Sequence, residues 1–197
     1  MTYRKTIKHY HEPGDLHELT FSCYRRMPLL TNDAWRGHLA RNLDGALVGE
    51  QFHLVAFVFM PEHVHLLVWP TRNDTTAECI SRFLVAVKVG TSQQVKADLE
   101  RCGSRLLPRL TVPERSGRTS FRYWQKGPGY DRNLQNETSV TAAIDYVHLN
   151  PVRRGLCKSA QDWRWSSARW YVSEGAEVDD QLPTIHGPPP ELFGPCR

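Results

Sequence analysis

The chain lacks the long apolar runs that a membrane protein needs. No window of its 197 residues approaches the ~18 consecutive apolar residues that span a bilayer, and the mean hydropathy is −0.50. Residues 1–30 alternate charged and apolar types without the apolar core of a secretion signal. The five cysteines are irregularly spaced and form no CxxC pair, which disfavours a zinc ribbon or a disulfide framework. These absences predict a cytoplasmic protein with reduced thiols and no membrane partner.

Acidic residues are scarce in two segments, although the formal charge of the whole chain is only +4. Between 101 and 120 a single acid, Glu114, faces five arginines: Arg101, Arg105, Arg109, Arg115 and Arg118. A second basic cluster follows an Asn-Pro dipeptide and comprises Arg153, Arg154 and Lys158. Two interpretations stay open: contacts with nucleic-acid phosphates, or a solvated loop with favourable charges at a helix C-terminus.

Hydrophobic periodicity predicts an α+β fold without internal repeats. Alternating apolar residues predict strands at 17–25, 52–60, 63–70 and 120–125, and helical spacing predicts helices at 31–48, 75–100 and 137–150. Residues 101–120 have no periodicity, which favours a mobile loop, and the Gly- and Pro-rich residues 173–197 favour an extended C-terminal tail. This order predicts a ferredoxin-like split βαβ arrangement, an antiparallel sheet with helices packed on one face.

His63 and His65 begin the apolar strand HVHLLVWP. Residues i and i+2 of a strand project from the same face, about 6.5 Å apart, so the two imidazoles project together. Paired neutral imidazoles suit a divalent metal ion. The alternative is a pair of surface or hydrogen-bonded core histidines. Two ligands are also an incomplete site, so a metal role requires a third ligand from elsewhere in the chain.

The segment SVTAAIDYVHLNPVRRGL supplies a candidate for that ligand. Tyr146 and Asn150 lie four residues apart, on one flank of the apolar stripe of a helix. Pro151 disfavours helical geometry at Asn150, so we expect the helix to end there and the carboxamide to reach the metal. A tyrosine beside a metal ion that polarises a phosphodiester is suited to nucleophilic attack on phosphorus. The alternative for Tyr146 is an ordinary residue at the edge of the core.

Four motifs in this order resemble the HUH single-tyrosine transposases, in which U is hydrophobic, and especially the REP-associated tyrosine transposases. The motifs are FMPEHVHLL, YWQKGPGYDRNL, DYVHLNPVRRGL and DWRWSSARWY. The resemblance covers roughly residues 16–172 and implies a catalytic domain at 1–172, followed by the tail at 173–197. Glu62 replaces the asparagine that often precedes the first histidine of the family, and the Arg-rich segment 101–120 is longer than usual.

The resemblance implies a ferredoxin-like fold and a transposase that cleaves and rejoins single-stranded DNA next to hairpins through a 5′-phosphotyrosine intermediate. It implies Mg²⁺ or Mn²⁺ at His63 and His65, with Asn150 at the third-ligand position and Tyr146 as the nucleophile. The arginines of 101–120 and the cluster at 153–158 are then the expected DNA contacts. The family includes dimers and monomers, so a homodimer stays open.

Two other functions compete with this hypothesis. A domesticated hairpin-DNA-binding protein would keep the fold without catalysis, but it would have no need of both histidines and the tyrosine. A metallohydrolase would need a carboxylate base beside the ion, and only Glu62 and Asp145 are near; we expect Glu62 to point away from the histidines. Tyr123 and Tyr130 are rival nucleophiles, which we expect to lie in the core and in a turn.

Overall fold

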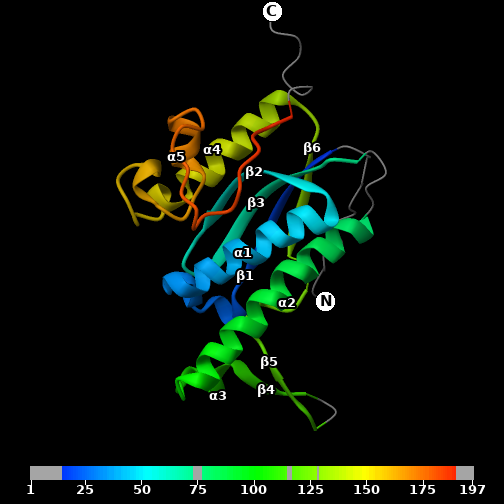
Figure 1. The fold of residues 1–197 in the computed structure, drawn as a ribbon, viewed down its shortest axis with the longest axis vertical. Coiled ribbons are helices and arrows are strands. Elements are labelled where there is room, and N and C mark those ends of the chain that lie inside the picture. The colour runs from blue at the N-terminus through cyan, green and yellow to red at the C-terminus, as the bar shows by residue number, and fades with distance from the viewer. Residues whose placement is uncertain (1–14, 73–76, 115–116, 128, 190–197) are drawn as a thin grey trace, which may run out of the picture.

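The computed structural model describes residues 15–72, 77–114, 117–127 and 129–189. Four strands form the central sheet: β1 (Leu16–Ser22), β2 (Phe52–Phe59), β3 (His63–Pro70) and β6 (Tyr130–Leu134). Their order is β2-β3-β1-β6, and all neighbours are antiparallel. β3 therefore lies between β1 and β2, and β1 lies between β3 and β6. This is the predicted split βαβ arrangement, and the α+β class is confirmed (Figure 1).

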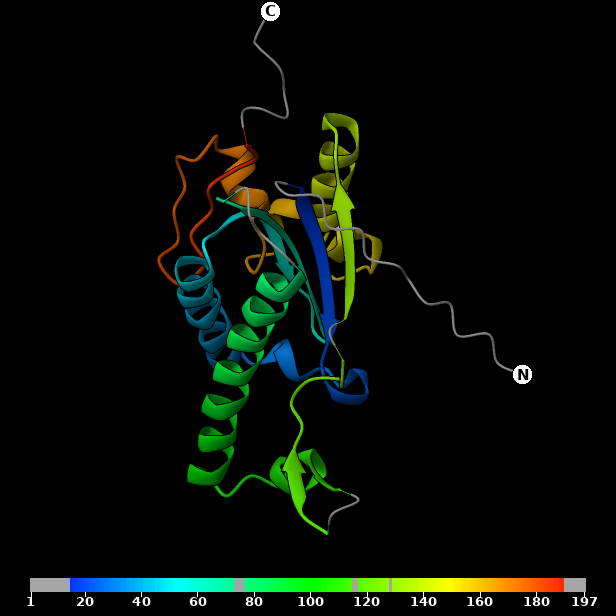
Figure 2. The ribbon, with the colours of Figure 1, turned by 90° about the vertical axis from the view of Figure 1, so that its right-hand side faces the viewer.

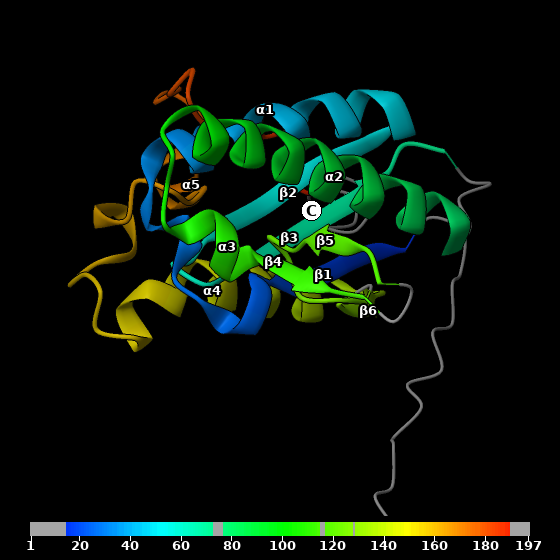
Figure 3. The same ribbon diagram turned by 90° about the horizontal axis from the view of Figure 1, so that it is seen from below.

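The main helices lie on both faces of the sheet, so the prediction that they pack on one face is wrong. α1 (Asp33–Glu50) and α2 (Ala77–Arg101) cover one face, and α4 (Glu137–Arg153) covers the other, as Figures 2 and 3 show. The reason lies in β3, where Leu66 packs in the cluster beneath α1 and α2, and Leu67 packs in the cluster beneath α4. A strand that is apolar on both faces needs a cover on each.

The segment between α2 and α4 differs most from expectation. The expected loop forms α3 (Leu106–Leu110) and a two-stranded sheet of β4 (Thr111–Pro113) and β5 (Thr119–Phe121), which project as an arm at the lower end of Figure 1. The fourth strand of the main sheet is β6, whereas 120–125 contributes only an isolated bridge between Trp124 and Cys23. β6 was missed because it is a polar edge strand, with Leu134 as its one buried residue.

Gly129 permits β6 to approach β1. Its φ is 98°, and a Cβ atom at this position would clash with the carbonyl oxygen of Thr20. The chain can therefore turn sharply before Tyr130 and pair Tyr130 directly with Thr20. This pairing extends the sheet beyond β1 and forms one wall of the site described below.

α4 continues three residues beyond its predicted end. Asn136 caps the helix by accepting a hydrogen bond from the amide of Ser139, and the helix runs through Pro151 to Arg153. Proline removes one backbone donor, but the amide of Arg154 still bonds to the carbonyl of Asn150 at 3.1 Å, so the last turn closes. Asn150 is consequently a buried helical residue rather than a freed terminal one.

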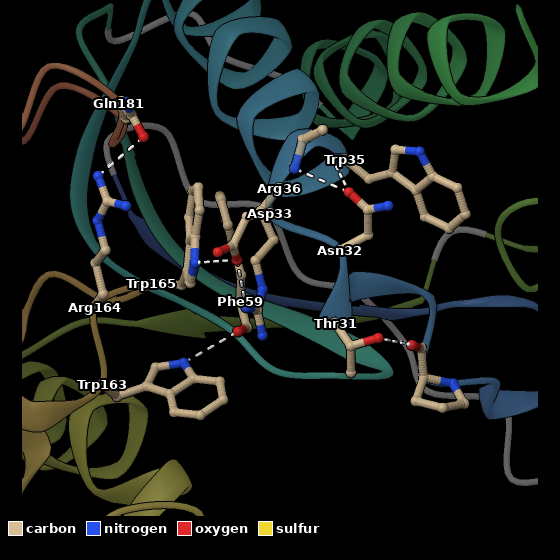
Figure 4. A network of polar contacts seen from close by, with 12 residues as sticks. Thr31, Asn32, Asp33, Trp35, Arg36, Phe59, Trp163, Arg164, Trp165 and Gln181 are labelled. Atoms are coloured by element: carbon tan, nitrogen blue, oxygen red, sulfur yellow. Dashed lines mark hydrogen bonds and ion pairs between the residues drawn. The ribbon is translucent and has the colours of Figure 1, made fainter. Parts of the chain in front are cut away.

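The segment DWRWSSARWY (162–171) connects the start of α1 to the end of β2 (Figure 4). The indole of Trp163 donates to the carbonyl of Phe59 at 3.1 Å, and that of Trp165 donates to Asp33 at 2.8 Å. The buried guanidinium of Arg36 also donates to Asp33 and lies over the Trp163 ring, 5.2 Å from its centroid. These contacts fix the end of β2, from which the chain turns into the histidine strand.

The remaining described elements are short. Single 3₁₀ turns and one helical turn connect the main elements: η1 (Tyr24–Arg26), η2 (Leu29–Thr31), η3 (Ala160–Asp162) and α5 (Ala168–Val172). Residues 173–189 contain neither helix nor strand, as expected of an extended tail, and the His186 amide donates to the Leu54 carbonyl of β2 at 2.8 Å. The predicted boundary at 173 stays a prediction, and residues 190–197 lie outside the described range. No helix within the described ranges is long and apolar enough to cross a membrane.

A buried histidine helps to hold α4 on the sheet and makes stability depend on pH. His148 shares a 2.8 Å hydrogen bond with Ser167, whose hydroxyl in turn accepts from the amide of Phe57. Burial lowers the pKa of His148 to about 4. Between pH 6.5 and 4 the unfolded state therefore binds a proton at this residue that the folded state does not, so the free energy of unfolding falls as pH falls.

We expect His148→Gln to remove this part of the acid sensitivity, since glutamine can hydrogen-bond Ser167 without titrating. Urea unfolding in EDTA should show that the wild type loses about 3 kcal/mol more than the variant between pH 6.5 and 4. Parallel stability curves for the two proteins would show that His148 gains its proton equally in the folded and unfolded states.

Candidate active site

A pocket of about 690 Å³ lies between α4 and the β1–β6 half of the sheet. α4 packs its apolar stripe, which includes Val140 and Val147, mainly against β2 and β3, and polar residues of β1 and β6 line the space beside it. Polar and cationic side chains from five segments line the pocket, with two alanines of α4: Glu18, Thr20, Ser22, Arg26, His63, His65, Tyr130, Arg132, Ala142, Ala143, Tyr146, Asn150 and Arg154. All four residues of the predicted metal and nucleophile set are therefore in one pocket.

The two histidines face each other through the same ring nitrogen. The Nε2 atoms of His63 and His65 lie 3.0 Å apart, and the side-chain amide of Asn150 lies 3.1 Å from Nε2 of His65. The other ring nitrogens have partners of their own. Nδ1 of His65 lies 2.8 Å from the hydroxyl of Thr20, and Nδ1 of His63 lies 3.2 Å from the carboxylate of Glu62. The ionised carboxylate of Glu62 only accepts, so it places the proton of His63 on Nδ1, and the Thr20 hydroxyl can accept from Nδ1 of His65 in the same way; this tautomer leaves Nε2 with its lone pair.

Both imidazoles are neutral near pH 7. Burial, with a smaller contribution from His63, lowers the pKa of His65 to about 3. Burial also lowers the pKa of His63, although the carboxylate of Glu62 opposes the shift. Two neutral rings with Nδ1 protonated direct two lone pairs toward one another at 3.0 Å, which is repulsive unless a proton or a cation lies between them. This donor set fits a divalent cation.

If these two imidazoles hold a metal ion, the nearest candidate for a third donor is the amide oxygen of Asn150. Within the described ranges, no three or more His, Cys, Asp or Glu side chains are grouped so as to hold a metal ion. Asn150 has the required reach, because a half-turn of its carboxamide would bring Oδ1 to the position beside Nε2 of His65. Two imidazole nitrogens and one amide oxygen are compatible with Mn²⁺, and the oxygen also with Mg²⁺.

Tyr146 lies one helical turn before Asn150, at the mouth of the pocket. Its side chain is 40% exposed, and its ring packs edge-on against the His65 ring with a centroid separation of 5.5 Å. The guanidinium of Arg153 lies over the tyrosine ring, 5.4 Å from its centroid. The phenol is therefore accessible to a macromolecular substrate, beside the candidate metal ligands and a cation.

The rival tyrosines differ from each other in position. Tyr123 is 1% exposed in the core, as predicted, and burial raises its pKa well above the ordinary value. Tyr130 is the first residue of β6 and lines the pocket, so its prediction as a turn residue is wrong. Tyr130 therefore remains a rival nucleophile, although the ring contact with His65 belongs to Tyr146.

Glu62 does not point away from the histidines, and that prediction is also wrong. Its carboxylate accepts from Nη1 of Arg154 at 2.8 Å and meets Nδ1 of His63. Glu62 precedes the first paired residue of β3, so strand alternation does not govern its direction. Burial raises the pKa of Glu62, but the Arg154 hydrogen bond and the nearby charges outweigh burial and hold that pKa below the ordinary value. An ionised carboxylate on the Nδ1 side orients His63 and lies away from its metal-facing edge.

Several pocket residues could not be recognised without the topology. Thr20, Glu18 and Arg132 are brought together only because β1 lies between β3 and β6. Burial raises the pKa of Glu18, opposed by Arg132, whose guanidinium lies 3.3 Å from the carboxylate. Arg26 lines the pocket from η1 with φ 52°, an uncommon backbone conformation for a residue other than glycine. The signal available in the sequence was the polar alternation of Glu18, Thr20 and Ser22.

The predicted DNA-contacting cations fall into two places. Arg153 and Arg154 border the pocket, and Lys158 is exposed beyond the end of α4. The arginines of 101–120 do not line the pocket: Arg101, Arg105, Arg109 and Arg118 are exposed at the end of α2 and on the arm. Arg101 donates to Asp98 at 2.6 Å. Arg115 lies outside the described residues.

The comparisons with known proteins agree with the resemblance. No family model matches the chain. A Haemophilus influenzae protein named as a REP-associated tyrosine transposase is 27% identical over 116 residues, which cover 59% of this chain and 58% of that protein. The match thus spans less than two thirds of that protein's length. The solved structure of a REP-associated tyrosine transposase bound to a REP hairpin matches with a TM-score of 0.64 and 20% identity, covering 94% of this chain and 98% of that one.

Proposed function

We propose that this chain, which resembles REP-associated tyrosine transposases in sequence and in fold, cleaves and rejoins single-stranded DNA next to hairpins. Tyr146 is the nucleophile, and His63, His65 and Asn150 hold Mg²⁺ or Mn²⁺. One observation carries the proposal: two buried neutral imidazoles, an amide and an accessible tyrosine converge in a single pocket. The hairpin is inferred from the structural match, in which a REP-associated tyrosine transposase is bound to a REP hairpin.

The reaction conserves the number of phosphate ester bonds. The phenolic oxygen of Tyr146 bonds to phosphorus while the bond from phosphorus to the 3′ oxygen breaks. The phenol gives up its proton, and the departing 3′ oxygen takes one and becomes a hydroxyl. The product is a 5′-phosphotyrosine ester, which a 3′ hydroxyl can attack in the reverse sense to rejoin the strand. A bound divalent ion would polarise the phosphodiester and neutralise its charge.

Other residues of the chain orient the two imidazoles and place cations for a phosphodiester. Thr20 and Glu62 orient the two imidazoles through Nδ1, so that both Nε2 atoms converge on one point. Arg154 holds Glu62 in place and remains half-exposed at the pocket edge, where its guanidinium is available to a phosphate. Arg153 places a second cation beside the Tyr146 ring, which suits a phosphodiester at this position.

The burial of the two neutral histidines favours an enzyme over a non-catalytic binding protein. Burial that lowers the pKa of His65 to about 3 opposes any role of this ring as a phosphate-binding cation. A protein that only bound DNA would gain affinity from protonated or exposed side chains, since phosphate contacts dominate such binding. The metallohydrolase is also disfavoured, because Glu62 is already bonded to Arg154 and to the Nδ1 side of His63.

Trapping a covalent intermediate tests the proposal. We expect the protein, incubated with hairpin-flanked single-stranded DNA and Mn²⁺, to yield a protein–DNA adduct that survives denaturing electrophoresis. The adduct should be absent when EDTA is added and when the same DNA is supplied as a plain duplex. Cleavage without an adduct would indicate attack by water, and neither product from any hairpin substrate would leave the binding protein as the better description.

A further inference from the structure

A second concave surface lies on the opposite face of the sheet from the catalytic pocket. This basic groove, of about 430 Å³, runs between the middle of α2 and residues 120–126: it is lined by four cations, by aromatic rings and by no carboxylate. The cations are Lys88, Lys96, Arg122 and Lys126. The volume is within the range of about 300–1,000 Å³ typical of small-ligand pockets, so the groove suits an unpaired nucleotide rather than a double helix.

The groove offers both groups that recognise an unpaired nucleotide. Phe121 lines it as a partly buried residue, packed against the core but not enclosed by it, and an aromatic face is a stacking surface for a base. Lys126 is exposed. Lys96 forms an exposed ion pair with Glu100 at 3.3 Å, which a phosphate can displace with little loss of free energy. The guanidinium of Arg122 is bound to Glu114 and contributes less.

The groove and the catalytic pocket share a thin wall. Ser22, which lines the pocket, accepts a hydrogen bond from the amide of Gln125 at 2.8 Å, and the adjacent residues Cys23 and Trp124 form a bridge. Trp124 and Lys126 line the groove on the other side of this backbone. Lys88 reaches the same place, since its ammonium lies 4.8 Å from the Phe21 ring centroid and donates to the carbonyl of Gly127 at 3.2 Å. Backbone of residues 22–23 and 124–125 therefore lies between the catalytic pocket and the groove.

We propose that the basic groove binds an unpaired segment of the DNA substrate that flanks the cleaved position, with a base on Phe121 and phosphates on Lys96 and Lys126. The inference rests on the proposed function for the identity of the substrate, but the groove itself is a separate binding site. Its charge complements a polyanion, and its ring distinguishes an unpaired strand from other polyanions.

The test measures binding without chemistry, in full-length protein carrying Tyr146→Phe. The probes are a fluorescent hairpin DNA and the same hairpin with unpaired extensions of about ten nucleotides, a length within the ~4–16 nucleotides of single-strand sites. Lys96→Ala/Lys126→Ala should weaken binding of the extended hairpin about tenfold and reduce its salt slope by about 1.4, or about 0.7 for each lost phosphate contact. Affinity for the bare hairpin should change less than about twofold.

Two further variants separate stacking from charge. Phe121→Leu, which removes the ring but keeps an apolar side chain, should weaken binding of the extended hairpin at least about fivefold without changing the salt slope. Arg41→Ala/Arg82→Ala removes two exposed cations, one on α1 and one on α2, that do not line the groove, and should have no effect. Circular dichroism checks that each variant is folded.

Three outcomes would overturn the inference. Equal losses of affinity for both probes would assign these lysines to the hairpin stem. An equal loss of affinity in the Arg41→Ala/Arg82→Ala control would show that the effect arises from net charge alone. Displacement of the DNA by polyglutamate of the same charge concentration would show that bases play no part. Because none of these measurements needs an adduct, they are independent of whether Tyr146 reacts.

Discussion

Tyr146→Phe is expected to abolish the covalent adduct and to reduce strand cleavage by about 10⁴ or more, the scale typical of losing a nucleophile. The substitution removes only the phenolic oxygen. The ring contacts with His65 and Arg153 are retained, so folding, Mn²⁺ affinity and DNA affinity should stay within about twofold of the wild type. Denaturing electrophoresis of labelled DNA measures the adduct, and calorimetry measures the two affinities.

Tyr130→Phe is the matched control, because Tyr130 lines the same pocket with a similar exposed fraction. This variant should still form the adduct. Peptide mapping of the wild-type adduct should recover the DNA on the α4 peptide that contains Tyr146. Recovery on the β6 peptide would transfer the nucleophile role to Tyr130, and continued cleavage by Tyr146→Phe without any adduct would replace both tyrosines by water.

The periodic parts of the chain could be predicted from the sequence, because side-chain alternation reports burial directly. The strand containing the histidines and the helix containing Tyr146 were both located, and β3 begins at His63 as predicted. β6 was missed for the same reason. As a polar edge strand it owes its place to pairing with β1 and to the turn at Gly129, and pairing leaves no periodic signal in a sequence.

The proximity of the candidate metal ligands and the candidate nucleophile could be predicted because each pair of residues is local. His63 and His65 are two residues apart in a strand, so their side chains lie on the same face. Tyr146 and Asn150 are four residues apart in a helix, so they lie one turn apart on the same side. The contacts that orient these residues are not local. Thr20 contacts His65 from the neighbouring strand β1, where the two residues are paired. Arg154 contacts Glu62 from the C-terminal end of α4. Only the assembled fold brings them together.

Pro151 shows how a local rule can be outweighed. The residue before a proline is disfavoured in a helix, which predicted an end at Asn150. Yet the preceding turn is anchored in the core by Val147 and by His148, and the amide of Arg154 still closes on Asn150. Tertiary packing therefore carries the helix past the proline. The result favours the site, because Asn150 is held in a helical turn and buried beside His65 rather than left at a frayed end.

We expect that removing the His65 side chain strongly weakens metal binding and leaves the fold intact. His65→Ala deletes the ring whose Nε2 lies between His63 and Asn150, so we expect Mn²⁺ affinity to fall by more than about 100-fold, beyond the ~10–100-fold typical of losing an orienting partner. Cleavage should fall in parallel. Thr20→Val is the graded comparison: it keeps the ring but removes its Nδ1 partner, and should lose about 10–100-fold.

The Mn²⁺ affinity of both variants should be measured by titration followed by electron paramagnetic resonance. Their free energy of unfolding should be measured with urea at pH 7. The order of affinities, wild type above Thr20→Val above His65→Ala, is the signature of a metal site whose ligand is oriented through Nδ1. If instead His65 is a structural core residue, its removal would lower the free energy of unfolding and leave Mn²⁺ affinity unchanged. Undiminished cleavage in EDTA would have the same meaning, because the two lone pairs at 3.0 Å would then be joined by a proton rather than by a metal ion.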